Sequence, residues 1–131
     1  MKKLLLFTIL ITLLGCSKEV VKLPTTYTVT NNSTVKLYDV VVFHFNGLEV
    51  TGQSNVQNLD AGESSTIKEV SNVEKVVVSF KIAPNESRLF TVTRFLLTVE
   101  QNTNIVIDNE IMLSRDLNPL KTQLNLYDYL K

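Results

Sequence analysis

Short segments in which apolar and polar residues alternate recur along this chain, and they restrict its fold more than any other feature. The clearest segment spans residues 75–82, where even-numbered positions are apolar and odd-numbered ones include Ser79 and Lys81. A two-residue period predicts a β-strand with one buried face. Polar clusters such as Ala83-Pro84-Asn85-Glu86 interrupt these segments every eight to twelve residues or so, which is the spacing of an all-β sandwich or barrel.

Other segments extend this pattern. We expect a first strand around Tyr27 and Val29, and a central strand over Val35–Phe45 because its middle is apolar on both faces. Asn46-Gly47 predicts a tight hairpin with two positive-φ residues. Further strands are predicted at 48–50, 56–59, 64–70 and 105–113, with Ile105, Ile107, Ile111 and Leu113 inward.

Two places resist a simple strand assignment. Phe90 and Val92 share one parity, whereas Phe95, Leu97 and Val99 share the other, so we predict a bulge near Thr93-Arg94. Near the C-terminus, Leu120, Leu124 and Tyr127 have helical spacing after Asn118-Pro119. The same residues also fit a strand, which the β character of the chain favours.

The N-terminus has the layout of an export signal. Met1-Lys2-Lys3 is cationic, and Leu4–Leu14 is an apolar run interrupted by Thr8 and Thr12. Spanning a bilayer takes about 20 apolar residues, so this run predicts a cleaved signal peptide rather than a membrane-spanning helix. Cys16, the one cysteine of the chain, follows Gly15 at its end and has no partner for an intramolecular disulfide.

Leu13-Leu14-Gly15-Cys16 resembles the lipobox of bacterial lipoproteins. That resemblance implies cleavage before Cys16 and acylation of its thiol with fatty-acid chains such as palmitate, which holds a protein on a membrane without spanning it. Residues 17–24 then read as a tether, since Pro24 discourages helix at Leu23. Ser17 lacks the acidic character that retains lipoproteins in the inner membrane, so the sorting rules imply the outer membrane; Lys18-Glu19 leaves its periplasmic or surface face open.

Three motifs in the body resemble immunoglobulin-like adhesion modules of the FxLYD and CARDB type: Asn31-Asn32-Ser33, Leu37-Tyr38-Asp39-Val40-Val41-Val42 and Leu59-Asp60-Ala61-Gly62-Glu63-Ser64. The chain is also similar to small uncharacterised lipoproteins of Bacteroidetes, a likeness that implies no activity. The resemblance implies an immunoglobulin-like sandwich whose loops or edges make contacts.

Composition excludes several functions. The 131 residues are 44% hydrophobic, which predicts a folded core, and 13 basic residues balance 13 acidic ones. Removing Lys2 and Lys3 leaves 11 against 13, a net charge of −2. This charge gives no electrostatic footprint for nucleic acid.

Few residues of the chain are candidates for catalysis or metal binding. His44, the single histidine, lies among large apolar residues and reads as a structural imidazole rather than a catalytic base. One His and one Cys do not make a zinc site. The oxygen-bearing side chains near residue 105 would be calcium ligands, but turn chemistry and a solvated strand explain them better; they are Asn102, Asn104, Asp108, Asn109 and Glu110.

The remaining candidates are carboxylates and tyrosines. Acid pairs for glycan hydrolysis would come from residues such as Glu49, Glu69, Glu74 and Glu100, although charges on outward positions also keep a sheet soluble. Tyr38, Tyr127 and Tyr129 are candidate contact residues, because tyrosine is frequent at interfaces. None of these residues is assigned as a site.

The sequence therefore predicts a signal peptide at 1–15, a lipidated cysteine and tether at 16–24, and a single antiparallel immunoglobulin-like β-sandwich of about seven or eight strands at 25–131. The expected function is a non-catalytic binding or accessory module, without cofactor or metal, lipid-anchored in a bacterial envelope, most simply in the outer membrane. Its partners would be membrane lipid through Cys16 and an envelope protein or glycan. A structural envelope protein without discrete ligand, and a carboxylate-dependent glycan hydrolase, are the alternatives.

Overall fold

The computed structural model describes residues 19–91 and 93–110. Within them the chain forms eight strands, in keeping with the expected all-β class. In chain order they are β1 (Thr25–Asn31), β2 (Leu37–Asn46), β3 (Glu49–Leu59), β4 (Lys68–Val70), β5 (Lys75–Lys81), β6 (Leu89–Phe90), β7 (Phe95–Leu96) and β8 (Asn102–Ile107).

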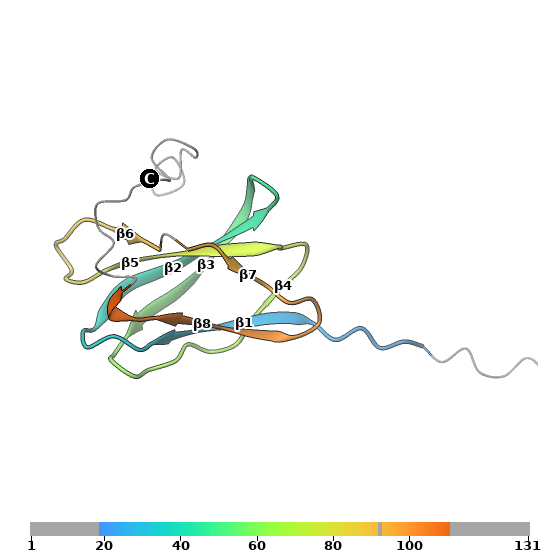
Figure 1. Ribbon diagram of the computed structural model, residues 1–131, viewed down its shortest axis with the longest axis horizontal. Helices are drawn as coiled ribbons and strands as arrows, with labels where there is room; N and C mark the ends of the chain where they lie inside the picture. Colours follow the sequence, from blue (N-terminus) through green and yellow to red (C-terminus); the bar gives the residue numbers. More distant parts are fainter. Residues whose placement is uncertain (1–18, 92, 111–131) are drawn as a thin grey trace, which may run out of the picture.

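The strands build two sheets that face each other as a β-sandwich, seen edge-on in Figure 1. The small sheet has the order β4-β1-β8, and the large one has the order β3-β2-β5-β6 with β7 also paired to β5. β2 is therefore central, as its apolar middle predicts. The pairs are antiparallel except β1 with β8, which run parallel. The strand pattern alone does not predict this parallel pair.

The two-residue period correctly predicts which side chains enter the core between the sheets. Val76, Val78 and Phe80 of β5 are buried there, and Ile105 and Ile107 of β8 meet them from the small sheet. Tyr27, Val29, Leu37, Val40, Val42 and Leu59 complete the fully or almost fully buried part of this cluster.

The opposite face of the large sheet differs from the expectation for β5. Val77 and Ser79, assigned outward by the alternation, are completely buried. Val77 joins Val41, Phe43 and Phe45 of β2 in a second apolar cluster, which Val50 and Phe90 flank. β2 and β5 therefore bury both faces, whereas the alternation of β5 predicts one.

This second cluster also explains the parity pattern that predicts a bulge near Thr93-Arg94. The chain does break there, because β6 pairs with β5 in one register and β7 in another, two residues displaced. Phe90 packs in the second cluster, and Phe95 packs in the core between the sheets. Because the register shifts by an even number of residues, each side chain stays on the face that its parity assigns. The irregularity is confirmed, but its reason is different: both faces are apolar.

A threonine side chain closes the gap between β6 and β7. Thr91 is completely buried, and its backbone N–H donates to the Val78 carbonyl at 2.9 Å. Its hydroxyl accepts from the Val78 N–H at 3.1 Å and donates to the Thr93 carbonyl at 3.1 Å. The hydroxyl thus satisfies backbone groups that a regular ladder would pair directly.

The predicted hairpin connects β2 and β3, with Asn46 paired to Glu49. Gly47 has φ +61°, but Asn46 is not among the positive-φ residues, so the expected pair of positive angles is wrong. A single glycine at the first central position is the pattern of a type II′ turn. The segments expected at 48–50 and 56–59 form one strand, β3, at the edge of the large sheet. The segment expected at 64–70 is a strand only at Lys68–Val70.

A buried asparagine fastens the end of β1 to the large sheet. Asn31 Nδ2 donates to the carbonyls of Val35 at 2.8 Å and Leu59 at 3.0 Å. Its Oδ1 accepts from the backbone N–H of Ser33 at 3.1 Å and from the Ser33 hydroxyl at 2.6 Å. Asn31 and Ser33 of the Asn31-Asn32-Ser33 motif thus connect β1 to the large sheet through buried polar contacts.

Some predictions fall outside the described residues: the signal peptide, Cys16, and the C-terminal segment around 118–129 with Tyr127 and Tyr129. Within the described part, no helix has the length and apolar character that crossing a bilayer requires.

Candidate functional site

The segment predicted as a tether is described from residue 19 onward. Residues 19–24 contain no strand and are exposed, including the apolar Val20, Val21 and Leu23. In Figure 1 this segment, drawn in blue, leads away from the sandwich. The described chain therefore reaches the domain through an open segment that ends at Thr25.

Three loops surround the point where the tether joins the domain, and we call this the tether end. Glu100 N–H donates to Thr25 Oγ1 at 2.9 Å, which places the β7–β8 loop there. The β2–β3 hairpin is bound to the β4–β5 loop, since Asn46 Nδ2 donates to Asn72 Oδ1 at 2.8 Å and the Gly47 N–H donates to Glu74 at 3.0 Å. Thr25, Asn46, Asn72, Glu74 and Val99 line a common pocket of about 290 Å³.

His44 is the polar centre nearest to this end. It lies on β2 with the same parity as Val40 and Val42, so it points between the sheets and is only 9% exposed. Its Nε2 lies 3.0 Å from the hydroxyl of Tyr27 on β1 and 3.1 Å from the hydroxyl of Ser54 on β3. The imidazole therefore joins the two sheets through a buried hydrogen bond.

Burial sets the protonation state of this pair. It lowers the pKa of His44 because desolvation disfavours the imidazolium. It raises the pKa of Tyr27, against a smaller opposing effect of the Ser54 hydrogen bond. At neutral pH His44 is therefore neutral and Tyr27 protonated, and the two share a hydrogen bond between the phenol oxygen and Nε2.

The second imidazole nitrogen is not part of this bridge between the sheets. Nδ1 has no hydrogen-bond partner among the described residues, and the imidazole lines a pocket. Gly52 lies opposite His44 in the β2–β3 register, and a Cβ there would sit 3.6 Å from Nδ1. A Ser-His-Asp triad instead holds this nitrogen with a carboxylate. The geometry thus supports a hydrogen-bonding role for His44.

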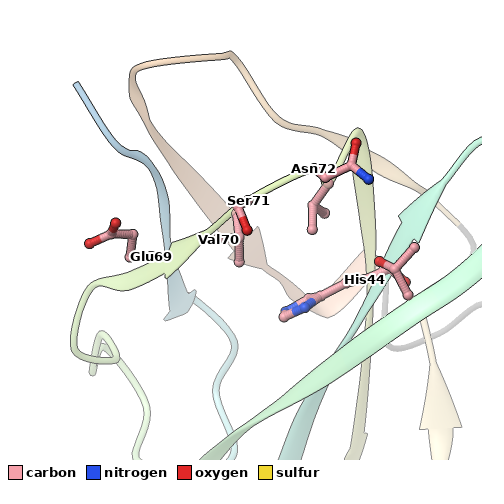
Figure 2. Close-up of a pocket in the computed structure, with 7 residues that line it drawn as sticks. His44, Glu69, Val70, Ser71 and Asn72 are labelled. Carbon is pink, nitrogen blue, oxygen red and sulfur yellow. The ribbon is translucent and has the colours of Figure 1, made fainter. Parts of the chain in front are cut away.

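A pocket of about 420 Å³ opens beside the imidazole. Figure 2 shows His44 facing the segment that carries Val70, Ser71 and Asn72. The remaining lining residues are Thr51, Glu69 and Val73. Hydroxyl, amide and imidazole groups converge here, which is the chemistry that binds a small polar group. The parity of His44 with Val40 and Val42 is the sequence signal that could have placed it inside this rim.

Three of the five side chains considered for calcium accept hydrogen bonds from segments distant in sequence. Asn102 Oδ1 accepts from Thr26 Oγ1 at 3.0 Å, and Asn104 Oδ1 accepts from Thr28 at 3.2 Å and Thr30 at 2.8 Å. Asn109 Oδ1 accepts from the Thr34 N–H at 3.1 Å, at the opposite end of the sandwich. Among the residues described, no three His, Cys, Asp or Glu side chains gather into a group that could hold a metal ion.

The carboxylates considered for hydrolysis, Glu49, Glu69, Glu74 and Glu100, are all exposed. Glu69 lines the His44 pocket and Glu74 lines the pocket at Thr25. Glu63, which is not one of the four candidates, lines a third pocket of about 290 Å³ between β3 and the β3–β4 connection. Each of these pockets contains one carboxylate. Tyr38 is half-buried with Lys36 Nζ 5.8 Å from its ring centre.

An ion cluster at the far end of β2 is not evident from the sequence. Arg88 binds both the carboxylate and the carbonyl of Asp39, and it also donates to Ser79 Oγ at 3.2 Å. Asp39 has φ +52°, at an irregularity in the pairing of β2 with both neighbours. Lys81 Nζ lies 3.7 Å from the same carboxylate. These residues hold a strained turn of the strand in place.

Comparison with known proteins adds little to this geometry. No protein-family model matches the chain, and no curated protein matches it significantly. The chain is similar to a solved protein described as "NMR structure of the protein from Eubacterium rectale", with 18% identity, a match over 72% of this chain and 84% of that one, and a TM-score of 0.49. The site is therefore interpreted from this chain's own residues.

Proposed function

We propose that the protein is a lipoprotein anchored in a bacterial cell envelope, in the outer membrane, and that its sandwich is a non-catalytic binding or accessory module. The observation that carries the proposal is Cys16, the only cysteine, placed after Gly15 at the end of the apolar run Leu4–Leu14. A single cysteine in an exported chain has no partner for an intramolecular disulfide. Acylation of its thiol explains a cysteine at this position.

The tether supports this proposal. Residues 17–24 span at most about 28 Å when extended. Of these, the described residues 19–24 are exposed and outside any strand, so they leave the anchor free to reach a membrane. The tether end then faces the bilayer, and the opposite end, with the loops at 32–36, 60–64 and 82–88, faces away.

Two kinds of contact surface fit a binding module. The pocket beside His44 offers converging polar groups for a small ligand group, such as part of a glycan. The loops of the opposite end offer a surface to a protein partner in the same envelope. We place the ligand contact at His44, because the imidazole lines this pocket and its Nδ1 has no hydrogen-bond partner among the described residues, while Nε2 is fixed by Tyr27 and Ser54.

Mass spectrometry of the full-length protein purified from bacterial membranes tests the anchor. We expect loss of residues 1–15 and a mass increase at Cys16 that corresponds to acyl chains. Cys16→Ser should keep its leader and lose the added mass, whereas the matched neighbour Ser17→Ala should behave as wild type. A bare thiol at Cys16 in the wild-type protein would overturn the proposal.

Cross-linking in the intact envelope, followed by purification in detergent, tests the binding module. A discrete partner should be recovered with the wild type and reduced when Ser71→Arg fills the His44 pocket. The exposed Ser87→Arg, in the loop before β6, is the control for added charge. Repeated recovery of the protein alone would contradict a partner-binding role and favour a structural one.

A further inference from the structure

Exposed apolar side chains concentrate at the tether end of the sandwich. Beyond the tether itself, the large apolar residues most exposed to solvent are Leu48 at 73%, Val99 at 73%, Leu96 at 67% and Ile67 at 65%. Single exposed apolar residues are ordinary on protein surfaces. Two of these four, however, Leu48 and Val99, belong to the loops that surround Thr25, and Leu96 ends β7 beside them.

The hydrogen bonds fix where these three residues lie. Leu48 follows Gly47, whose N–H is held by Glu74. Leu96 pairs with Lys75, the residue that follows Glu74. The Leu97 N–H donates to the Glu74 carbonyl at 2.9 Å. Val99 lines the pocket that contains Thr25 and Asn46. The hairpin tip and the β7–β8 loop are therefore supported from within while their apolar side chains point to solvent.

We infer that the tether end of the sandwich lies on the lipid surface, with Leu48 and Val99 inserted at the boundary between headgroups and acyl chains. The inference rests on the proposed anchor at Cys16, because a tether of at most about 28 Å keeps this end close to the bilayer. Apolar side chains at such a boundary are buried about 5–10 Å into the interface. The tether residues Val20, Val21 and Leu23 are apolar and exposed as well.

The charges at this end indicate which lipid it meets. Glu49 and Glu100 follow Leu48 and Val99 in the chain, and the Glu74 carboxylate accepts from the Gly47 N–H. This end is not basic, so attraction to anionic headgroups does not drive the contact. We therefore expect contact with a bilayer of neutral zwitterionic lipid.

The chain contains no tryptophan, so a single introduced tryptophan reports its own surroundings. The full-length lipidated variants Leu48→Trp and Val99→Trp would be reconstituted into phosphatidylcholine vesicles in which part of the lipid carries bromine on its acyl chains. Bromine should quench about half of the emission of each variant, because a side chain at the interface lies within a few ångströms of the acyl chains. Val35→Trp, between β1 and β2 at the opposite end, should be unaffected.

Each result decides the inference. Equal emission of the Leu48 and Val99 variants in brominated and ordinary vesicles would overturn it, and so would a blue-shifted emission without quenching, which would place these residues against protein. The mass of the same samples separates this inference from the proposed function. An unacylated Cys16 refutes the anchor, whereas an acylated protein without quenching refutes only the membrane contact.

Discussion

Replacing the buried Asn31 by aspartate is the most direct test of how this sandwich is fastened. Asparagine and aspartate have nearly the same shape, but the carboxylate has no N–H to donate. The carbonyls of Val35 and Leu59 would lose the donor that now lies 2.8 and 3.0 Å away. A buried carbonyl without a donor costs about 1–2 kcal/mol, so the two together predict a loss of about 3 kcal/mol.

Equilibrium unfolding in urea measures this loss. For a domain of this size, with an m-value of about 1.5 kcal/mol per molar urea, the midpoint should fall by about 2 M at neutral pH without a change in m. Asn32→Asp is the matched control, because it adds the same charge at the next residue, which is exposed. Its effect should stay within about 0.5 kcal/mol.

The pH dependence sharpens the same test. Burial beside two carbonyl oxygens would raise the folded-state pKa of the introduced carboxyl above its unfolded value of about 3.9. The folded state then binds the proton more tightly, so the deficit of Asn31→Asp should shrink as pH falls through the folded pKa toward the unfolded one. Equal midpoints for Asn31→Asp and Asn32→Asp at neutral pH would refute the role given to the amide.

Three further substitutions probe other parts of the structure. Because burial lowers the pKa of His44, the unfolded chain binds more protons than the folded one below about pH 6.5, and wild-type stability should fall between about pH 7 and 5.5. The urea midpoint of His44→Gln should depend less on pH than that of the wild type. Midpoints of the two proteins that change in parallel with pH would contradict this. Thr91→Val should lower stability by about 1–3 kcal/mol in thermal unfolding and Thr91→Ser by clearly less, since serine keeps the bridging hydroxyl. Because Gln57 has φ +78°, Gln57→Gly should raise the stability of the domain by up to about 1 kcal/mol, whereas Gln53→Gly in the same strand should lower it by about 0.5–1 kcal/mol. Lower stability of both variants in urea unfolding would show that the positive φ of Gln57 carries no strain.

The strand pattern predicts the inner core because burial is a local property of alternation. Val76, Val78 and Phe80 share a face whichever strand lies beside them, and so do Ile105 and Ile107. The central position of β2 follows in the same way from its two apolar faces. Where the pattern fails, at Val77 and Ser79, the burial comes from neighbours distant in sequence: Phe43 lies opposite Val77, and Arg88 reaches Ser79.

Pairing and polar contacts are harder to predict, since they depend on which segments meet. The parallel register of β1 with β8 joins residues about 76 positions apart, such as Thr26 with Asn102, and local spacing contains no trace of it. Asn31 reads as a turn residue, because its partners Val35 and Leu59 approach only in the folded sandwich. His44 is a partial exception, since its parity already assigns it to the inner face.

The two ends of the sandwich differ in a way that bears on what a bound partner can be. The far end is closed by a backbone hydrogen bond from the Gly62 N–H to the Asn31 carbonyl at 2.7 Å and by an ion pair in which Lys36 Nζ lies 2.8 Å from Asp60. The tether end carries apolar loop tips and, around Ser71 and Asn72, the rim of the His44 pocket. With an anchor at Cys16, that pocket opens close to the bilayer, where a component held in the same leaflet is present at high effective concentration. A partner of the pocket should therefore be another envelope-bound molecule, and a binding signal that survives release of the domain from the membrane with undiminished strength would argue against this geometry.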